Sequence, residues 1–385
     1  MKGGELLERV LENVLVCLEK IRKKRNVFQA FVGFDGFVDT LVKPVKNMDG
    51  SGEMNFFGTI AEFGSYLSEK ADKSCSIELH KITEKMGGNA AIYASAISNL
   101  GLFTRCVGAF GYPEFKDIFG IVNDHMELIT ISNPGFCTAL EFSDGKVMLS
   151  ENEGINEINY KMLIERLGLE QLYHLIYKSD MISLMNWSEV PGSTDIWRGL
   201  LTDVFEALPR SSKKKMFIDI SDCSRRSTAD IEEMLDLIMA FTDYCEVALS
   251  LNENEFDILC EVCGISRENG LEMSGYRLLE RCPVNYLVVH LMHGAYAFFD
   301  HDCCFAQNRY VENPLISTGG GDNFNAGLSY GLMAGLDIRS AMVLANAVSG
   351  FYVTHGHSAS LEEIIQYLYA WREDMSISGV NREVS

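Results

Sequence analysis

The residues best suited to chemistry lie in a glycine run that ends in an acid, at positions 319–322 (Gly-Gly-Gly-Asp). Apolar residues recur at helical spacing from Phe324 to Leu336, so the run precedes a predicted helix. Glycines let a ligand approach the backbone closely, and the free N–H groups at a helix N-terminus favour an anion. Asp322 can then take a proton from a hydroxyl that attacks phosphorus, while the N–H groups stabilise the transferring group. The run predicts phosphoryl transfer, although Asp322 alone also fits an ordinary first-turn acid after a flexible loop.

Far upstream, a second glycine run completes a resemblance to a known family. Met86-Gly87-Gly88-Asn89-Ala90-Ala91, with Leu100-Gly101 at the usual spacing, resembles the N-terminal signature of the ribokinase-like carbohydrate kinases, also called the PfkB family. The run from Gly319 to Gly327 resembles their C-terminal signature. Residues 33–39, 252–255 and 345–350 resemble the first strand with its substrate aspartate, the Asn-x-x-Glu motif and the late helix beside the nucleotide. The likeness covers about residues 29 to 370.

This resemblance implies a sugar kinase that uses ATP and Mg²⁺, aided in some members by a monovalent cation. The duller alternatives are that the aspartates and Asn89 are turn or helix caps, that 252–255 is a routine helix start, and that Asn346 satisfies a buried backbone group. The site residues that the resemblance implies are Asp322 as general base, with Gly319, Gly320 and Gly321 beside it; Asp35, Asp39, Gly87, Gly88 and Asn89 at the sugar-like acceptor; and Asn252, Glu255, Gly294 and Asn346 at the nucleotide, with Glu255 binding Mg²⁺ through water.

Three departures from the family pattern bear mainly on the phosphoryl donor. Ile316 stands where the C-terminal signature begins with aspartate, residues 290–292 (His-Leu-Met) replace the usual Thr-x-Gly, and Ile92 replaces a frequent asparagine. The Gly-Gly-Gly-Asp run is intact, which keeps kinase chemistry first. A nucleoside kinase, an ADP-dependent sugar kinase and a non-catalytic nucleotide or sugar sensor of the same fold stay open, although a sensor needs no base. A dehydrogenase is disfavoured because no Gly-x-Gly-x-x-Gly opens the first helix after an early strand.

The elements that must position these residues alternate between strands and helices. Apolar runs at 30–33, 181–184, 216–220, 247–251 and 286–291 predict strands, with helical patterns between them. Such alternation predicts βαβ units and a mostly parallel sheet covered on both faces, with sites at the carboxyl ends of the strands. Together with the resemblance, it leads us to expect a three-layer α/β/α ribokinase-like fold.

One region departs from this alternation. Residues 138–149, with a turn at 143–145, predict an antiparallel hairpin. Members of the family cover the sugar with a small β lid, so the resemblance implies lid segments near 39–60 and 136–151. A helix predicted at 60–67 enlarges this lid.

The N-terminus carries an apolar seam from Leu7 to Ile21, which predicts a helix. Family members usually begin with the first strand. We therefore expect residues 1–28 to form a helical extension of a kinase domain at 29–385, packed either on that domain or on another subunit of a homodimer.

Composition excludes several classes of protein. The chain has 385 residues, 47% of them hydrophobic, and only 7 prolines, so it can bury a large core. A formal net charge of −21 argues against nucleic acid or an anionic membrane as a partner. No window reaches 18 uninterrupted apolar residues, and Glu5 and Glu8 stand where a signal peptide needs an apolar run. We therefore expect a cytoplasmic protein.

Eleven cysteines in such a chain predict reduced thiols that mostly fill the core. Cys260 and Cys263 have a spacing that suits a metal, but no second pair of this kind accompanies them. Cys303 and Cys304 are adjacent and lie near His301. We expect all four to be structural, without zinc.

Overall fold

The central sheet positions the site, and seven of its nine described strands run parallel. The computed structural model describes residues 3–24, 28–120, 122–209, 214–312, 314–316 and 318–383. The strand order is β14-β13-β12-β11-β10-β9-β1-β5-β6, with β13 and β14 antiparallel at one edge. The bounds are β1 Gln29–Gly33, β5 Phe103–Ala109, β6 Met126–Ser132, β9 Met181–Leu184, β10 Lys214–Asp219, β11 Cys245–Asn252, β12 Tyr286–Leu291, β13 Gly294–Phe299 and β14 Asp302–Gln307.

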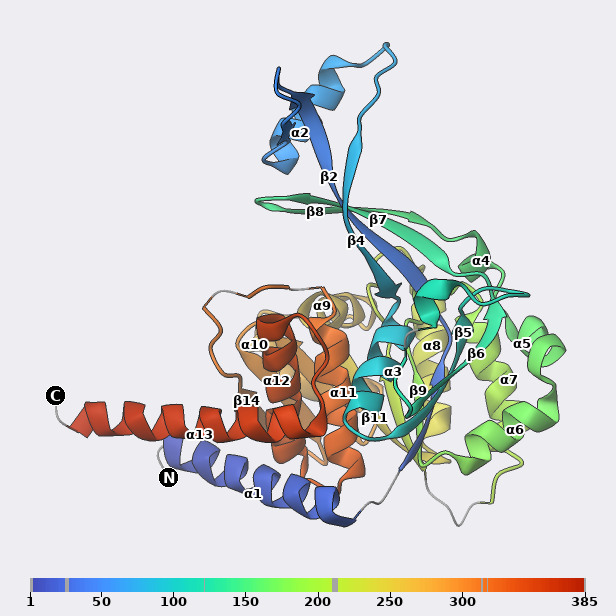
Figure 1. Cartoon of the computed structure of the whole chain (residues 1–385). Helices are drawn as coiled ribbons and strands as arrows, with labels where there is room; N and C mark the ends of the chain where they lie inside the picture. The colour runs from blue at the N-terminus through green and yellow to red at the C-terminus, as the bar shows by residue number, and fades with distance from the viewer. Residues whose placement is uncertain are drawn as a thin grey trace.

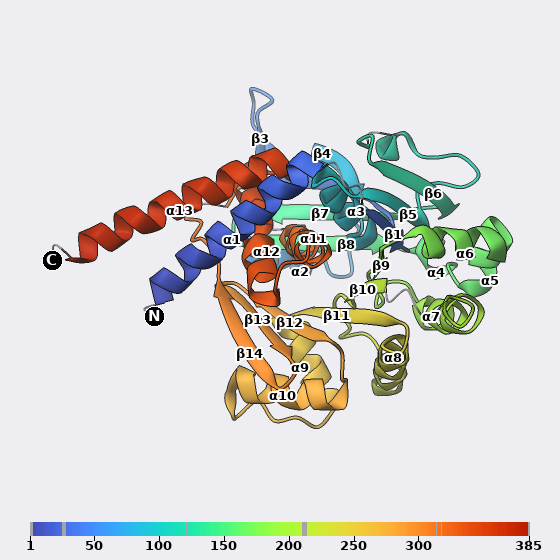
Figure 2. The same cartoon turned by 90° about the horizontal axis from the view of Figure 1, so that it is seen from below.

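Helices cover both faces of this sheet, as Figures 1 and 2 show. Successive strand residues serve opposite faces: Ala30 and Val32 of β1 join one core, and Phe31 joins the other. The predicted three-layer α/β/α fold is therefore confirmed. One layer holds α1 Gly3–Lys24, α3 Asn89–Asn99, α11 Gly320–Met333, α12 Ile338–His355 and α13 Leu361–Glu383; the other holds α5 Tyr160–Leu167, α6 Leu169–Lys178, α7 Ser193–Gly199 with a π-helix at Leu200–Phe205, α8 Thr228–Phe241, α9 Glu253–Val262 and α10 Gly270–Arg281.

A second sheet, which we call the small sheet, projects from the sandwich (Figure 1). In it β2 pairs with β7 in parallel and with β3 and β4 antiparallel, and the predicted hairpin is confirmed as β7 and β8. The predicted helix at 60–67 is confirmed as α2, whose Phe63 packs with Val42 and Leu140 in a separate core. The bounds are β2 Phe37–Met48, β3 Met54–Phe56, α2 Ile60–Glu69, β4 Leu79–Gly87, β7 Gly135–Phe142 and β8 Gly145–Glu151, followed by the short helix α4 Glu153–Asn156.

Strand β4 is the part of the small sheet that the sequence did not indicate, because neither predicted lid segment reaches residues 79–87. Its residues up to Glu84 are exposed, so they lack the apolar alternation that marks a strand.

Helix α1 packs on its own chain. Leu11, Val14 and Leu18 of its seam are fully buried in the core that α12 and α13 share. The seam therefore faces the sandwich rather than another subunit, while the division of the chain at residue 28 stays a prediction. In the part of the chain that the structure describes, no helix is both long and apolar enough to cross a membrane.

Candidate functional site

A polar cavity of about 340 Å³ lies at the carboxyl ends of β9, β10, β11 and β12, where α11 begins. Parallel strands bring their carboxyl ends to one edge, so residues far apart in sequence meet there. A larger cavity of about 520 Å³, beside Tyr286 at the amino end of β12, gathers none of the predicted site residues. The cavity at the carboxyl ends is lined by Asn89, Asn186, Glu189, Asp219, Ser221, Asp222, Asn252, Glu255, His290, Gly321 and Asp322.

Asp322 is the third residue of α11 and is buried, yet its Oδ1 has no hydrogen-bond partner. The first backbone bond of this helix runs from the Asn323 N–H to the Gly319 carbonyl at 3.1 Å, so the N–H groups of Gly320 and Gly321 have no helical acceptor. Gly319 has a φ of 92°, and a Cβ there would lie 2.7 Å from the Tyr352 hydroxyl. The start of the helix thus presents N–H donors beside a carboxylate that has one unpartnered oxygen.

Asn325 fixes α11 against the central sheet. Its Nδ2 donates to the Asp219 carboxylate, and its Oδ1 accepts from the Ser250 hydroxyl at 2.7 Å. Asp219 ends β10 and also accepts from the backbone N–H of Ser221 at 2.9 Å. These buried bonds hold Asp322, one turn earlier on the helix, in a fixed orientation.

Four buried acids lie within electrostatic range of one another. Burial raises the pKa of Asp322 well above its ordinary value, and the charges of Asp219, Asp35 and Glu255 raise it further. Burial, followed by the charge of Asp219, raises the pKa of Glu255 to about 8. Burial also raises the pKa of Asp219. The ionised forms of these carboxyls repel one another and have no cation within the cluster, so a bound cation would stabilise them.

Asn252 and Glu255 form a reciprocal cap at the start of α9. The Glu255 N–H donates to Asn252 Oδ1 at 2.9 Å, and the Asn252 N–H donates to Glu255 Oε2 at 2.9 Å. The Asn252 side chain also donates to Glu255 Oε1 at 2.6 Å. The duller helix-start role is therefore present, and both residues still line the cavity. Their predicted roles at the metal and nucleotide stay predictions.

Asp35 anchors the start of α3 rather than facing the cavity. The N–H groups of Asn89 and Ala90 donate to its two oxygens at 3.0 and 2.7 Å, and Asn186 Nδ2 donates to Oδ2 as well. Asp35 is fully buried, which raises its pKa to about 6 despite these bonds. Its contacts favour positioning of Asn89, whose side chain lines the cavity, and its predicted contact with the acceptor stays a prediction.

Asp39 lies at the root of the small sheet and leans over the second glycine run. A Cβ added at Gly87 would lie 2.3 Å from Asp39 Cγ. Gly88 has a φ of 91°, and a Cβ added there would lie 3.0 Å from the Gly36 Cα. Only glycines leave room for this approach. Asp39 is half-buried, which raises its pKa, and Lys85 partly offsets the shift.

Two of the predicted nucleotide residues converge on the backbone of β14. Asn346 Nδ2 donates to the Ala306 carbonyl at 3.0 Å, and a Cβ at Gly294 would lie 2.4 Å from the same oxygen. Asn346 therefore satisfies a buried backbone group, as its duller alternative stated. Neither residue lines the cavity, and their contact with a nucleotide stays a prediction.

His290 ends the stretch of β12 that faces the cavity, at a position where the family pattern differs. Its ring packs on Phe324 with centroids 5.0 Å apart, and its Cε1 lies 3.6 Å from the Cβ position of Gly321. Burial lowers the pKa of His290 to about 4, so the ring is neutral near pH 7. It can donate one hydrogen bond into the cavity without adding charge.

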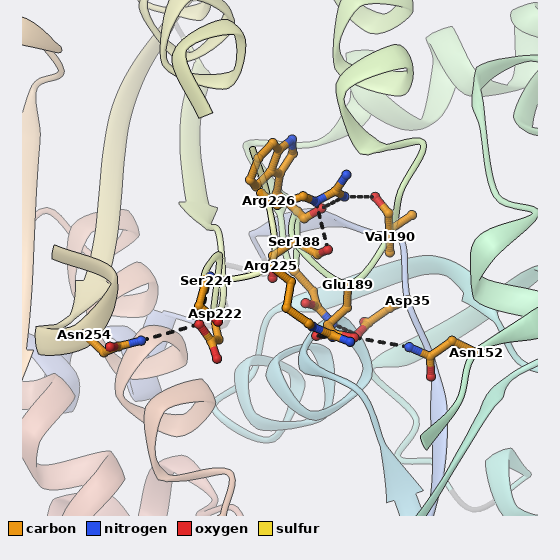
Figure 3. Close-up of polar contacts among 12 residues, drawn as sticks. Asp35, Asn152, Ser188, Glu189, Val190, Asp222, Ser224, Arg225, Arg226 and Asn254 are labelled. Carbon is orange, nitrogen blue, oxygen red and sulfur yellow. Dashed lines mark hydrogen bonds and ion pairs between the residues drawn. The ribbon is translucent and has the colours of Figure 1, made fainter. Parts of the chain in front are cut away.

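Glu189 and Asp222, on the loops that follow β9 and β10, line the cavity, and Figure 3 shows the polar contacts of these loops. Arg226 donates to the carbonyls of Ser188 and Val190 at 3.0 and 2.9 Å and so fixes the loop that follows β9. On this loop Glu189 pairs with Arg225, which is largely exposed. Arg225 therefore contacts a cavity residue, and its charge already has a carboxylate partner.

Sequence reasoning missed several cavity residues: Asn186, Glu189, Asp219, Ser221 and Asp222. A signal existed, because Asp219 lies near the end of the strand predicted at 216–220, and Asn186 follows the strand predicted at 181–184 by two residues. Asn186 and Ser221 also adopt φ values of 57° and 56°, which non-glycine residues rarely do outside special sites. Of the predicted residues, the cavity is lined by Asn89, Asn252, Glu255, Gly321 and Asp322. The others do not line it: Asp35, Asp39, Gly87, Gly88, Gly294, Gly319, Gly320 and Asn346.

Comparison with known proteins agrees with this architecture. The family model of the prokaryotic ketohexokinases matches residues 8–371. A ketohexokinase of Haloferax volcanii is 24% identical over 354 residues, which cover 90% of this chain and 92% of the relative. An uncharacterized sugar kinase of Escherichia coli is also 24% identical, over 74% of this chain and 82% of its own.

Solved structures show the same fold. A fructokinase of Xylella fastidiosa with bound ATP superposes with a TM-score of 0.63 at 12% identity, covering 90% of this chain and 98% of the other. A ribokinase of Arabidopsis thaliana complexed with ribose and ATP superposes with a TM-score of 0.63 at 15% identity, covering 89% of this chain and 99% of the other. The predicted ribokinase-like fold is confirmed. The chain is a sugar kinase that belongs to the prokaryotic ketohexokinase family.

Proposed function

We propose that the protein transfers the terminal phosphoryl group of ATP to a hydroxyl of a ketohexose, with Asp322 as the general base. The observation that carries the proposal is the buried Asp322 carboxylate, whose Oδ1 has no partner, beside the N–H groups of Gly320 and Gly321. A base must reach the hydroxyl proton, and N–H donors must reach the charge that builds on the transferring group. Both requirements meet at the start of α11.

Asp322 takes the proton of the acceptor hydroxyl as its oxygen attacks phosphorus. The acceptor lies between Asp322 and the root of the small sheet, where Asp39 accepts hydrogen bonds from its other hydroxyls and Asn89 donates or accepts a further one. The small sheet acts as the lid over this acceptor. Asp35 keeps α3 and Asn89 in place.

The residues of the cavity fit Mg²⁺. Asp219, Asp222 and Glu255 offer oxygen atoms, the ligand type that Mg²⁺ prefers, and two of them have a pKa raised by burial and mutual repulsion. Glu255 would hold the ion through water. A bound Mg²⁺ would supply positive charge that offsets the charge of the phosphates during transfer. In this arrangement the nucleotide side of the site includes His290, Asn252, Gly294 and Asn346. The proposed reaction takes place in the cytoplasm.

A kinase assay over ketohexoses, aldohexoses, nucleosides and polyols, with ATP and ADP as donors, tests the proposal. We expect turnover of a ketohexose with ATP and Mg²⁺, and NMR of the product identifies the phosphorylated hydroxyl. Parallel assays in Na⁺ and K⁺ decide whether a monovalent cation assists, and light scattering decides between a monomer and a homodimer. Preference for a nucleoside, or for ADP over ATP, would reject the substrate or donor proposed. No turnover of any acceptor would favour a sensor.

A further inference from the structure

Lys85 is a half-buried cation on β4 that points to the same side of the small sheet as Asp39. The two residues are directly opposed in the antiparallel pairing of β2 and β4, and opposed residues share a face. The preceding residues of β4, from Leu79 to Glu84, are exposed. Lys85 is therefore the first residue of β4 that is not exposed, two residues before Gly87.

Lys85 has no ion pair within 4 Å and no side-chain hydrogen bond in the part of the chain that the structure describes. Two other lysines of the small sheet have carboxylate partners: Lys81 pairs with Glu84 at 2.7 Å, and Lys46 pairs with Glu62 at 2.6 Å. Burial lowers the pKa of Lys85, as does Lys146, whereas the charges of Asp39 and Asp322 raise it. The ammonium group is thus within electrostatic range of the acceptor carboxylate and of the base, without direct contact with either.

A half-buried charge without a partner is costly unless a ligand supplies the partner. The cavity wall is acidic, and Arg225, which lies next to it, is already paired with the cavity residue Glu189. A neutral hydroxyl needs only an acceptor, which Asp39 provides. The transferring phosphoryl group, in contrast, spreads negative charge over three oxygens and needs cationic donors. Lys85 matches this group better than it matches the acceptor.

We propose that Lys85 is a catalytic residue that donates hydrogen bonds to the transferring phosphoryl group. This inference rests on the proposed kinase function. In the step, the acceptor oxygen bonds to phosphorus, the bond from phosphorus to the bridging oxygen breaks, and the nucleoside diphosphate leaves. Asp322 receives the hydroxyl proton, and Lys85 keeps its own. The small sheet then contributes to the chemistry as well as to covering the acceptor.

The test compares Lys85→Met with Lys85→Arg and with the control Lys81→Met, which removes an exposed, paired lysine from the same strand. We expect Lys85→Met to lower kcat by roughly 10²-fold, the usual cost of losing one donor to a developing charge. Calorimetry should show affinity for the unphosphorylated ketohexose within about threefold of wild type and affinity for the phosphorylated product at least ~10-fold weaker. Lys85→Arg should recover most of kcat, and Lys81→Met should behave as wild type.

Two results would overturn the assignment. One is a kcat of Lys85→Met close to that of wild type; the other is an equal loss of affinity for acceptor and product, which would make Lys85 an acceptor ligand. Should Lys85→Met melt below the assay temperature, the pair Lys85→Gln and Lys85→Arg gives the same comparison. A wild-type protein without kinase activity would reject the proposed function instead, so the two failures are distinguishable.

Discussion

The carboxyl ends of the central strands and the root of the small sheet hold their charged groups in opposite ways. On the central sheet, Asp35, Asp219 and Glu255 are buried, and each carboxylate accepts hydrogen bonds from its own chain. On the small sheet, Asp39 and Lys85 are half-buried and have no hydrogen-bond or ion-pair partner among the described residues. Hydrogen bonds within the protein hold the first set, whereas we propose that a ligand supplies the partners of the second.

Asp322 is the informative exception on the sandwich. It is as buried as its neighbours, yet one of its oxygens has no partner. A buried polar atom without a partner costs free energy, and such costs gather where a reacting group must bind. The comparison therefore agrees with the three proposed roles: residues that hold the site, one residue that reacts, and residues that bind the acceptor.

Asp322→Asn should have the largest effect, because it keeps the shape of the side chain and removes its basicity. We expect kcat to fall ~10² to 10⁴-fold, with nucleotide affinity and the melting temperature nearly unchanged. Steady-state kinetics and nucleotide titration measure both. A variant that kept more than about a third of wild-type kcat would show that Asp322 is not the base.

Asp39→Ala should affect the acceptor and spare the nucleotide, because Asp39 belongs to the small sheet. Loss of a charged hydrogen-bond partner predicts about 10 to 150-fold lower kcat/KM for the acceptor. Glu255→Gln, on the sandwich, should instead change the dependence on Mg²⁺ and nucleotide, with acceptor affinity within a few fold. Both variants need titration against each substrate. If Asp39→Ala weakened only nucleotide binding, the small sheet would serve the nucleotide rather than the acceptor, and the proposed assignment of the two regions would be wrong.

The sandwich was predictable because its signals are local. Buried parallel strands appear as apolar runs, and α11 appears as a glycine run before an apolar helix, so β9 to β12 and α11 needed no knowledge of distant residues. Asp322 and the Asn252 to Glu255 cap were found in the same way. Each motif lies within one short segment.

The rest of the site depends on contacts that no local pattern records. Asp219 accepts a hydrogen bond from Asn325, which is 106 residues away in sequence. Asp35 accepts a hydrogen bond from the N–H of Asn89 at the start of α3, 54 residues away. Lys85 lies in a polar stretch whose strand character comes from pairing with β2. A single polar residue at a strand end can be recognised as a candidate, but its partners come only from the fold.

Gly87→Ala should reproduce part of the effect of Asp39→Ala on acceptor binding, although it removes no functional group. The new Cβ would lie 2.3 Å from Asp39 Cγ, so the carboxylate must move. We expect roughly 10-fold weaker acceptor binding, the result of losing about one hydrogen bond. The matched control is Gly64→Ala on α2, where a Cβ meets nothing within 4 Å. Equal kinetics for the two variants would mean that the position of Asp39 over Gly87 is unimportant.

The smallest expected effect is on the pH dependence of the free energy of unfolding, to which the buried acids should contribute and exposed acids should not. Folding raises the pKa of Glu255 from 4.5 to about 8, so between these values the folded chain binds more protons there than the unfolded chain. The free energy of unfolding must then fall as pH rises through this window, and the Glu255 effect is absent below it. The melting temperature of the metal-free protein should fall by a few degrees from about pH 5.5 to 8, and Mg²⁺ should restore more of it at pH 8.

Glu255→Gln should flatten this pH dependence, because glutamine does not titrate. Glu253→Gln, which changes an exposed acid in the first turn of the same helix, should leave it as in wild type. Thermal melts of the three proteins with chelator and with Mg²⁺ provide the comparison, and elemental analysis of the same samples checks that no zinc is bound. Identical slopes for both variants would show that the buried cluster stores no unbalanced charge. The electrostatic difference between the buried acids at the carboxyl ends of the central strands and the charged pair on the small sheet would then have no support.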